Sequence, residues 1–242
     1  MTTSDTATPI DLLTQVAAST ARLDASIGAL TDTALAEPSL LPGWTRGHVV
    51  THLSRNADSM LNLLLWARTG IEIPQYASAA VRDADIEAGA PRPLDVQHAD
   101  FTAAAHRMRA VADTMPPVDW LAEVRNRQGG TLLADQIPWM RLRETEIHHV
   151  DLDVGYTPVD WPAEFVARLL PDAIADLSAK LLPEATPTFD IQSTDTDLIA
   201  TVGPGRPHHT VLGPSHALLA WLLGRTPGAD LTGPLPPLPA WK

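Results

Sequence analysis

Apolar residues recur every three to four positions along several long stretches of the chain, and this is the spacing of an amphipathic helix. The first such stretch covers about residues 9–30. Its apolar positions are Leu13, Val16, Leu23, Ile27 and Leu30. Thr8 followed by Pro9 suits an N-cap and a first helical position. The chain is therefore expected to begin with a long helix that buries one face.

A second helix is predicted from the N-cap candidate Thr45 to Gly70, because glycine often ends a helix. Its apolar stripe consists of Val49, Leu53, Ala57, Met60 and Leu64. Residues 71–92 contain two prolines and no clean period, so they predict a long loop that holds at most a short helix. The helical period then returns, and a third helix fits about residues 95–115.

A fourth helix is predicted after a turn-rich segment. Gly129-Gly130 suits the turn of a small hairpin within residues 116–134. Asp135 is a candidate N-cap for the helix that follows, and Pro138 lies in its first turn, where proline is tolerated. The stretch Trp139–Asp153 continues this helix.

The pattern changes after Gly155. A helix fits about residues 165–181, kinked or split at Pro171. The β-rich pieces that follow are Thr188–Ser193, Leu198–Val202 and His209–Leu212. Ser215 suits the N-cap of a last helix, and the proline-rich tail of residues 231–242 is expected to lie extended across a surface.

These elements predict a mainly α protein with a smaller α+β part. We expect an antiparallel four-helix bundle in residues 1–157 and a small α+β domain in residues 158–242. The length of 242 residues and the hydrophobic content of 45% allow this organisation. The apolar runs are shorter than a membrane span, and the N-terminus has neither a basic stretch nor a hydrophobic run. A cytoplasmic protein is therefore predicted.

Charge and cysteine content narrow the chemistry. The net charge of −12 disfavours nucleic acid, because phosphate binding needs a basic surface. The chain has no cysteine, which excludes disulfides, cysteine-ligated zinc and a cysteine nucleophile. Any thiol chemistry therefore needs a thiol from outside the chain.

The fourth predicted helix carries a candidate metal site. At about 100° per residue, Glu144 and His148 fall on the arc that Met140 and Ile147 occupy, which predicts core positions for both. A buried carboxylate or imidazole needs a partner. Two ligands at i and i+4 on one helical face can hold a divalent metal. The alternative is a buried hydrogen bond between Glu144 and His148, or a partly exposed face.

The second predicted helix offers the missing ligand. One histidine from it would complete a three-ligand site with an open position, the form that supports catalysis. Helical spacing alone does not choose between His48 and His52. His149 points about 100° away from His148, so we interpret it as a surface or interface residue. Asp151 shares the arc of Glu144 and is either a hydrogen-bond acceptor for a ligand imidazole or a solvated acid.

Arg225 follows the last predicted helix and has two interpretations. A cation is favoured at a helix C-terminus by the helix dipole. A guanidinium also suits bidentate binding of a substrate carboxylate.

The assembled residues make the sequence similar to the mycothiol-dependent maleylpyruvate isomerase family. One matching segment is Leu41-Pro-Gly-Trp-Thr-Arg-Gly-His-Val-Val-Thr-His52-Leu, with Asn56 and Leu64-Leu-Trp-Ala-Arg-Thr-Gly70 after it. Another comprises Trp139-Met-Arg141, Arg143-Glu144, Ile147-His148 and Val150-Asp-Leu. The third is Leu222-Leu-Gly-Arg225. Together they extend over nearly the whole chain.

The resemblance implies a fold, a metal and a reaction. It implies a DinB-like bundle in the N-terminal half and a zinc ion held by His52, Glu144 and His148, so it selects His52 over His48. Mycothiol is the family's thiol cosubstrate, and maleylpyruvate, a ring-cleavage product of gentisate, becomes fumarylpyruvate through a zinc-bound thiolate. Arg225 matches the family's substrate-side arginine. The thiol's sugar is expected in a cleft between the two domains.

Other functions stay open at this point. The same ligands suit a mycothiol S-transferase that conjugates or detoxifies electrophiles, or a metal-binding bundle protein that is not an enzyme. Two imidazoles and a carboxylate also suit iron or nickel. The sequence does not indicate an oligomeric state or the exact substrate.

Overall fold

The structure, a computed structural model, describes residues 7–181 and 188–239. The N-terminal stretch that bears on export and the last three residues of the predicted tail lie outside this part. The chain forms two compact units, Met1–Val154 and Gly155–Lys242. No helix among the described residues is long and apolar enough to cross a membrane. The chain is mainly helical, with small sheets, as the sequence predicts.

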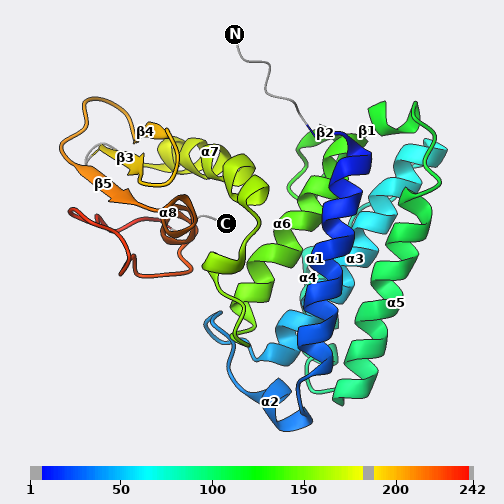
Figure 1. Cartoon of the computed structure of the whole chain (residues 1–242). Coiled ribbons are helices and arrows are strands. Elements are labelled where there is room, and N and C mark those ends of the chain that lie inside the picture. The colour runs from blue at the N-terminus through cyan, green and yellow to red at the C-terminus, as the bar shows by residue number, and fades with distance from the viewer. Residues whose placement is uncertain (1–6, 182–187, 240–242) are drawn as a thin grey trace. The chain divides into compact units, whose positions relative to one another are not determined.

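Four long helices build the first unit (Figure 1). They are α1 (Pro9–Gly28), α3 (Arg46–Thr69), α5 (Leu94–Ala112) and α6 (Ile137–Asp151). Helix α3 packs against both α5 and α6, and α1 packs against the same two helices. All four lie where the apolar period predicts them.

Capping side chains fix where two of these helices begin. The hydroxyl of Thr8 accepts from the Asp11 amide at 3.3 Å, and the Asp11 carboxylate accepts from the Thr8 amide at 3.0 Å. At the start of α3, the Thr45 hydroxyl accepts from the His48 amide at 3.4 Å. Gly70, with a φ of +70°, ends α3 in the left-handed conformation that glycine adopts without strain.

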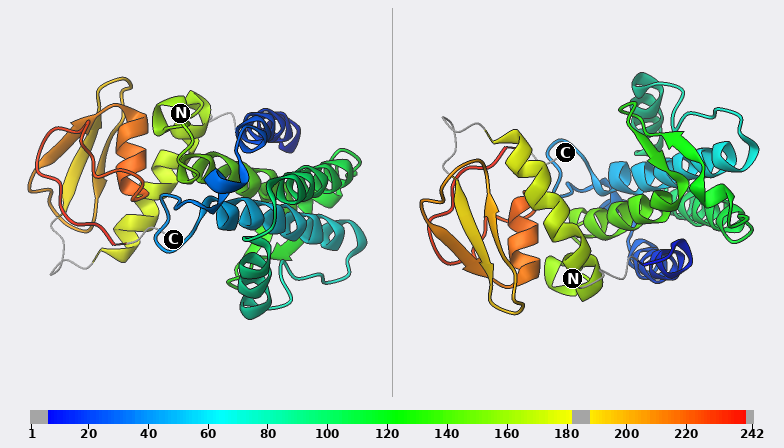
Figure 2. Two further views of the ribbon diagram at one scale, coloured as in Figure 1. Left: turned by 90° about the horizontal axis from the view of Figure 1, so that it is seen from below. Right: turned by 90° about the horizontal axis from the view of Figure 1, so that it is seen from above.

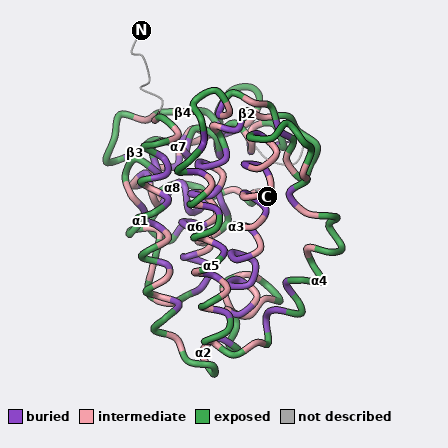
Figure 3. The backbone as a smooth tube through the Cα atoms, turned by 90° about the vertical axis from the view of Figure 1, so that its right-hand side faces the viewer, coloured by how far each residue is buried: buried purple, intermediate pink, exposed green. Residues whose placement is uncertain are grey.

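The core of the first unit has two apolar clusters with polar residues between them along α3. One cluster includes Val49, Val50 and Leu53, and the other includes Met60, Leu63 and Leu64. Between these segments α3 buries three polar side chains, Ser54, Asn56 and Ser59. Buried segments line the long helices in Figure 3. The candidate ligand His52 lies just before this polar interval.

The structure adds short elements to the first unit. Helix α2 (Asp32–Ala36) was not predicted, and α4 (Ala79–Gly89) fills much of the segment interpreted as a loop. Helix α4 is largely exposed and buries only Ile86 and Gly89, so its sequence has little apolar period to detect (Figure 3). The remaining short elements are η1 (Asp119–Leu121), η2 (Ala134–Gln136), β1 (Glu123–Arg125) and β2 (Thr131–Leu133).

The predicted hairpin is confirmed, because β1 and β2 pair antiparallel around Gly129-Gly130. The predicted cap of α6 is wrong. Asp135 lies inside η2, and Gln136 occupies the N-cap position without a capping hydrogen bond from its side chain. The 3-10 turn leads directly into α6, and Pro138 lies at the start of that helix, where its missing N–H costs nothing.

The second unit contains η3 (Pro158–Asp160), two helices and one sheet. The helices are α7 (Ala163–Lys180) and α8 (Ser215–Leu222), and the strands are β3 (Phe189–Ser193), β4 (Ile199–Val202) and β5 (Thr210–Gly213). Strand β3 is central, antiparallel to β4 and parallel to β5. Figure 2 shows α7 and α8 on one face of this sheet.

Two details of the second unit differ from the prediction. Pro171 lies inside α7, which continues as one helix, so of the kink and the split left open at Pro171 the split is wrong. Ser215 is the first residue of α8 and Pro214 is its N-cap. The Asp195 carboxylate accepts from the Ser215 amide at 2.9 Å, so a side chain from the segment between β3 and β4 satisfies an amide at the start of the helix.

Candidate metal centre

Three potential metal ligands from two helices converge in the first unit. His52 on α3 and Glu144 and His148 on α6 each offer one ligand atom, and these atoms lie within 4.8 Å of one another. Nε2 of His52 is 3.0 Å from Oε2 of Glu144, and Nε2 of His148 is 3.4 Å from the same oxygen. Among the described residues, no other group of three or more such side chains meets in this way.

Helix geometry explains why these residues meet. Glu144 and His148 are one turn apart on α6, so their side chains share a face. Helix α3 packs against α6 and carries His52 toward that face. The rings of His52 and His148 lie edge to face, with their centroids 4.6 Å apart. Residues far apart in the sequence are thus brought together by helix packing.

His48 does not join the cluster. Its Nδ1 accepts a hydrogen bond from the Thr45 amide at 3.2 Å, so the ring belongs to the N-cap of α3. Its Nε2 lies 3.4 Å from the Glu87 carboxylate on α4. Of the two histidines that helical spacing left open, the structure brings only His52 to Glu144 and His148.

A second carboxylate orients one of the two imidazoles. Nδ1 of His148 lies 2.8 Å from Oδ2 of Asp151, which is 1% exposed. A hydrogen bond from Nδ1 to a carboxylate leaves Nε2 available as a ligand, and metal-binding histidines commonly have such a partner. The interpretation of Asp151 as an acceptor for a ligand imidazole agrees with this contact.

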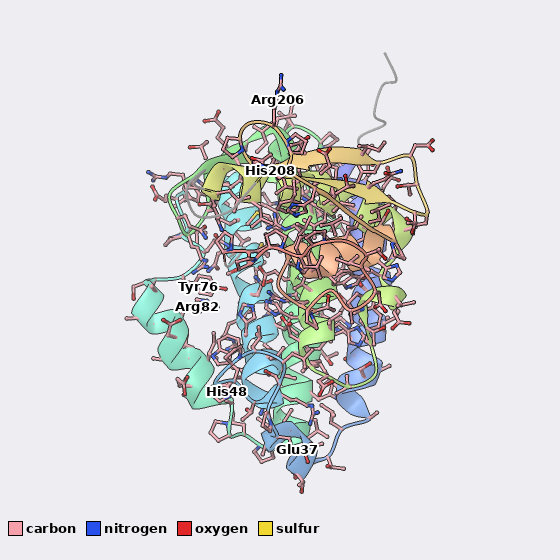
Figure 4. The ribbon with its side chains drawn as sticks, turned by 90° about the vertical axis from the view of Figure 1, so that its left-hand side faces the viewer. Glu37, His48, Tyr76, Arg82, Arg206 and His208 are labelled. Atoms are coloured by element: carbon pink, nitrogen blue, oxygen red, sulfur yellow. The ribbon has the colours of Figure 1, made fainter. Side chains whose placement is uncertain are left out.

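The other imidazole has an arginine as its neighbour. Nη2 of Arg82, on α4, lies 3.3 Å from Nδ1 of His52. The Arg82 guanidinium also lies over the ring of Tyr76, 5.8 Å from the ring centroid. Figure 4 shows Tyr76 and Arg82 close together near the start of α4. No sequence pattern pointed to Arg82, because residues 71–92 lack a period that would relate residue 82 to residue 52.

The three groups have different charge preferences. Burial lowers the pKa of His52 to about 4, against the opposing hydrogen bond with Glu144. Burial also disfavours the charged form of His148, but hydrogen bonds with Asp151 and Glu144 overcome it and raise the pKa to about 9. Burial would raise the pKa of Glu144, yet the hydrogen bonds from His148 and His52 hold it well below its usual value. Without a metal, an ionised Glu144 therefore pairs with a protonated His148 and a neutral His52.

The helical-angle argument correctly placed Glu144 and His148 on one face of α6, but it misjudged their burial. The side chains of Glu144 and His148 are 31% and 16% exposed, so the prediction of core positions for them holds only in part. His149 is 1% exposed, and its Nε2 lies 2.8 Å from the Ser26 hydroxyl on α1. It is an interface residue between helices, one of the two interpretations left open for it.

Arg141 is a buried residue of this region to which the sequence analysis assigned no role. It is 1% exposed, and its Nη1 donates to the Leu53 carbonyl at 2.8 Å and to the Asn56 side chain at 2.7 Å. Burial lowers the pKa of its guanidinium to about 10. Arg141 thus links α6 to the polar interval of α3, one turn before Glu144. An inward-pointing arginine gives no signal in an apolar period.

Arg225 belongs to the second unit. It comes directly after Gly224, and its Nη1 donates to the Leu223 carbonyl at 2.9 Å. This contact with a carbonyl at the end of α8 is what a helix-end cation makes. The predicted role as a carboxylate clamp stays a prediction.

The cluster fits a divalent metal by its donor set. Two imidazole nitrogens and one carboxylate oxygen, with an open position, are typical ligands of a catalytic zinc ion. One carboxylate oxygen already faces both imidazoles, and a metal among the three would replace those contacts with coordination bonds. A metal-bound histidine donates from its other ring nitrogen, and Nδ1 of His148 can donate in this way to Asp151. Nδ1 of His52 instead accepts from Arg82, which can only donate.

Comparison with known proteins gives two kinds of match. Residues 16–153 match the family model described as the mycothiol maleylpyruvate isomerase N-terminal domain, and residues 160–240 match the C-terminal domain of the same family. A crystal structure of the mycothiol-dependent maleylpyruvate isomerase is similar, with a TM-score of 0.91 and 27% identity over 100% of both chains. The structure of its H52A mutant matches with the same values. No curated protein matches the chain.

Proposed function

We propose that this chain, which belongs to the mycothiol maleylpyruvate isomerase family, is an enzyme that uses mycothiol to convert maleylpyruvate to fumarylpyruvate in gentisate degradation. The observation that carries the proposal is the convergence of His52, Glu144 and His148. We further propose that residues 1–157 form a DinB-like four-helix bundle that holds a zinc ion, with residues 158–242 as a second domain that contributes to the substrate cleft.

The described residues support distinct roles in this reaction. His52, Glu144 and His148 would hold the metal, and Asp151 would orient His148 through Nδ1. A bound divalent metal lowers the pKa of a thiol enough to make it a thiolate at neutral pH. The chain has no cysteine, so the nucleophile has to come from the cosubstrate.

The bond changes of the isomerisation balance without any redox step. The thiolate sulfur bonds to one alkene carbon, and the displaced electron pair moves onto the conjugated carbonyl oxygen as an enolate. The former double bond is now a single bond and rotates. The enolate then returns its electron pair, the carbon–sulfur bond breaks, and the thiolate leaves with the alkene in the trans form. We propose that Arg225 stabilises the enolate by hydrogen bonding.

A direct assay tests the proposal. Purified protein is analysed for metal and then mixed with zinc, mycothiol and maleylpyruvate while fumarylpyruvate is measured. We expect one zinc per chain and thiol-dependent formation of fumarylpyruvate. A protein that takes up no stoichiometric metal, or that forms no fumarylpyruvate with zinc and mycothiol present, would show the proposal to be wrong. If the metal analysis finds iron or nickel instead of zinc, the identity of the metal is corrected and the proposed reaction is unchanged.

Two variants separate the proposed roles. His52→Ala should abolish zinc binding and activity while leaving the helical circular dichroism largely unchanged, because the ring is a ligand and not part of a helix cap. Arg225→Ala should impair turnover while zinc remains bound. Full turnover in the His52 variant would contradict the metal assignment, and loss of zinc in the Arg225 variant would indicate a structural role. Thiol conjugation of other electrophiles without isomerisation would identify an S-transferase.

The environment of the proposed enzyme follows from its chemistry. Its partners are a small diacid and a low-molecular-weight thiol, and a net charge of −12 is unsuited to nucleic acid. We propose that it works in the cytoplasm. Measuring the isomerase activity in cytosolic and membrane fractions of the source cells tests this, and activity confined to membranes would contradict it.

A further inference from the structure

Arg82 donates a hydrogen bond to Nδ1 of His52, whereas a metal-bound His52 would need an acceptor at that nitrogen. An arginine side chain only donates hydrogen bonds. Nδ1 of His52, 3.3 Å from Nη2 of Arg82, therefore accepts in this structure. A neutral imidazole carries one hydrogen, so Nε2 holds it and donates to Glu144 at 3.0 Å. This is the tautomer in which Nε2 is not available as a ligand.

A metal on Nε2 requires the opposite tautomer. The ring hydrogen would then be on Nδ1, where a ligand histidine normally donates to an acceptor. Nδ1–H and the Arg82 guanidinium would be two donors facing each other. The positive charge of Arg82 also opposes a divalent cation nearby. His148 has no such conflict, because its Nδ1 faces the Asp151 carboxylate at 2.8 Å.

The surroundings of Arg82 allow it to leave His52 without leaving the site. Its Nη1 pairs with the carboxylate of Asp83 at 2.7 Å, and the Asp83 side chain is 66% exposed, so this partner lies at the surface. The guanidinium also stacks over the ring of Tyr76. The Arg82 side chain itself is 16% exposed. A guanidinium released from Nδ1 therefore stays beside Tyr76, as Figure 4 shows for these two residues, and presents donors next to His52.

We propose that Arg82 is an anion-binding arginine that is released from His52 when metal binds and that then pairs with a carboxylate of the substrate. A planar guanidinium fork matches the geometry of a carboxylate. The same arginine leaves His52 when metal binds and is then free to bind the carboxylate, so metal and carboxylate bind cooperatively. Each must raise the binding affinity of the other by the same factor. The inference rests on the proposed function, since it assumes a metal at His52.

Zinc titrations of metal-free protein test this coupling without any measurement of activity. The variants are Arg82→Gln, Arg82→Lys and the control Arg107→Gln. Glutamine is neutral and its amide oxygen accepts from Nδ1–H, whereas lysine keeps a charged donor at this position. Arg107 forms an exposed ion pair with Asp58 on the same unit, so its replacement removes one charge without touching His52. Each titration is repeated with maleate, a dicarboxylate used as the probe.

The expected results differ for each variant. Removing a misdirected neighbour of a ligand should change affinity by about tenfold. Arg82→Gln should therefore bind zinc about tenfold more tightly than wild type without maleate, and maleate should add little. Arg82→Lys should not gain this affinity. Without maleate, wild type and Arg107→Gln should bind zinc more weakly than Arg82→Gln does. Adding maleate should make both of them bind zinc more tightly than they do without it.

Nitrogen NMR of the His52 ring gives a second readout. Metal-free wild type should carry its ring hydrogen on Nε2, and zinc should move it to Nδ1. Equal zinc affinity in Arg82→Gln and Arg107→Gln, an undiminished maleate effect in Arg82→Gln, or a hydrogen already on Nδ1 without metal would each overturn this inference alone. A wild-type protein that binds no zinc would overturn the proposed function as well, so the two failures are distinguishable.

Discussion

Helix α6 buries polar side chains toward two different neighbours, α1 and α3, and the two sets are arranged in different ways. Toward α1 each of them contacts a side chain on the facing helix. The pairs are Thr145 with Ser19 at 2.8 Å, Glu146 with Arg22 at 2.6 Å, and His149 with Ser26 at 2.8 Å. Each buried group has its own partner on the facing helix, as buried polar groups require.

Toward α3 the polar groups converge instead of pairing. Nε2 of His52 and Nε2 of His148 both face one oxygen of Glu144. Deep burial does not mark the candidate ligands, since Glu146 is fully buried while the Glu144 side chain is 31% exposed. Convergence of several ligand atoms on one point is therefore what makes this cluster a candidate metal site, and inward orientation of a carboxylate or histidine is not sufficient.

The largest expected effect comes from exchanging the two glutamates for glutamine. Glu144→Gln should lower zinc affinity by at least about a hundredfold, because it removes a ligand whose supporting residues alone are worth about 10- to 100-fold. Glu146→Gln should leave zinc stoichiometry unchanged and lower the free energy of unfolding by about 1–3 kcal/mol, because Arg22 loses its ionised partner. Zinc titration and urea unfolding measure both. Loss of zinc in the Glu146 variant would erase the contrast between the two faces.

A smaller effect on the metal is expected from Asp151. Asp151→Asn keeps the shape of the side chain but presents a neutral amide to Nδ1 of His148. Zinc affinity should fall by about 10- to 100-fold, with the site still formed. Competition with a chelator of known affinity measures the change. If zinc binding in this variant equals wild type, Asp151 only fills space behind His148.

The spans of the four long helices were predictable because each has a long apolar period, and two of them also have recognisable ends. Thr8 and Gly70 are local signals, and the helix ends follow them. The short helices α2 and α4 were missed or left open because each buries at most two residues. Their formation depends on packing against the long helices, which local sequence does not record.

The candidate site was predictable only in part. Spacing on one helix relates Glu144 to His148, but no spacing relates either residue to a particular histidine on another helix. His48 does not join the cluster, because the Thr45 amide holds its Nδ1 at the helix cap and its Nε2 faces Glu87. The resemblance supplied His52, and packing of α3 on α6 shows why. Arg82 lies on α4, a helix whose bounds the sequence pattern did not predict, so the pattern could not predict its contact with His52.

The pH dependence of the metal-free protein should report the imidazoles of the converging set. The pKa of His148 is raised to about 9, so its contribution to stability is fully present below pH 6.5 and is lost as the pH rises through 9. The pKa of His52 is lowered to about 4, so its contribution is present above pH 6.5 and is lost as the pH falls toward 4. Urea unfolding between pH 4 and 10 measures both losses. His148→Gln should remove the alkaline loss, and an unchanged alkaline profile in that variant would contradict the assignment.

The smallest expected effect belongs to the histidine beside the site. His149→Phe keeps a ring between α6 and α1 but removes the hydrogen bond with Ser26, which is only half-buried and can bond to water instead. The free energy of unfolding should therefore fall by only about 1 kcal/mol, and zinc affinity should stay at the wild-type value. Urea unfolding and zinc titration of the same sample measure both. His149 is adjacent to His148 in the sequence and more deeply buried, so it is the strictest comparison available. Equal loss of zinc from this variant and from His148→Gln would mean that the two faces of α6 act as one site. Retained zinc in the His149 variant would mean that two adjacent residues of the helix differ in role, with His149 in a structural hydrogen bond and His148 as a metal ligand.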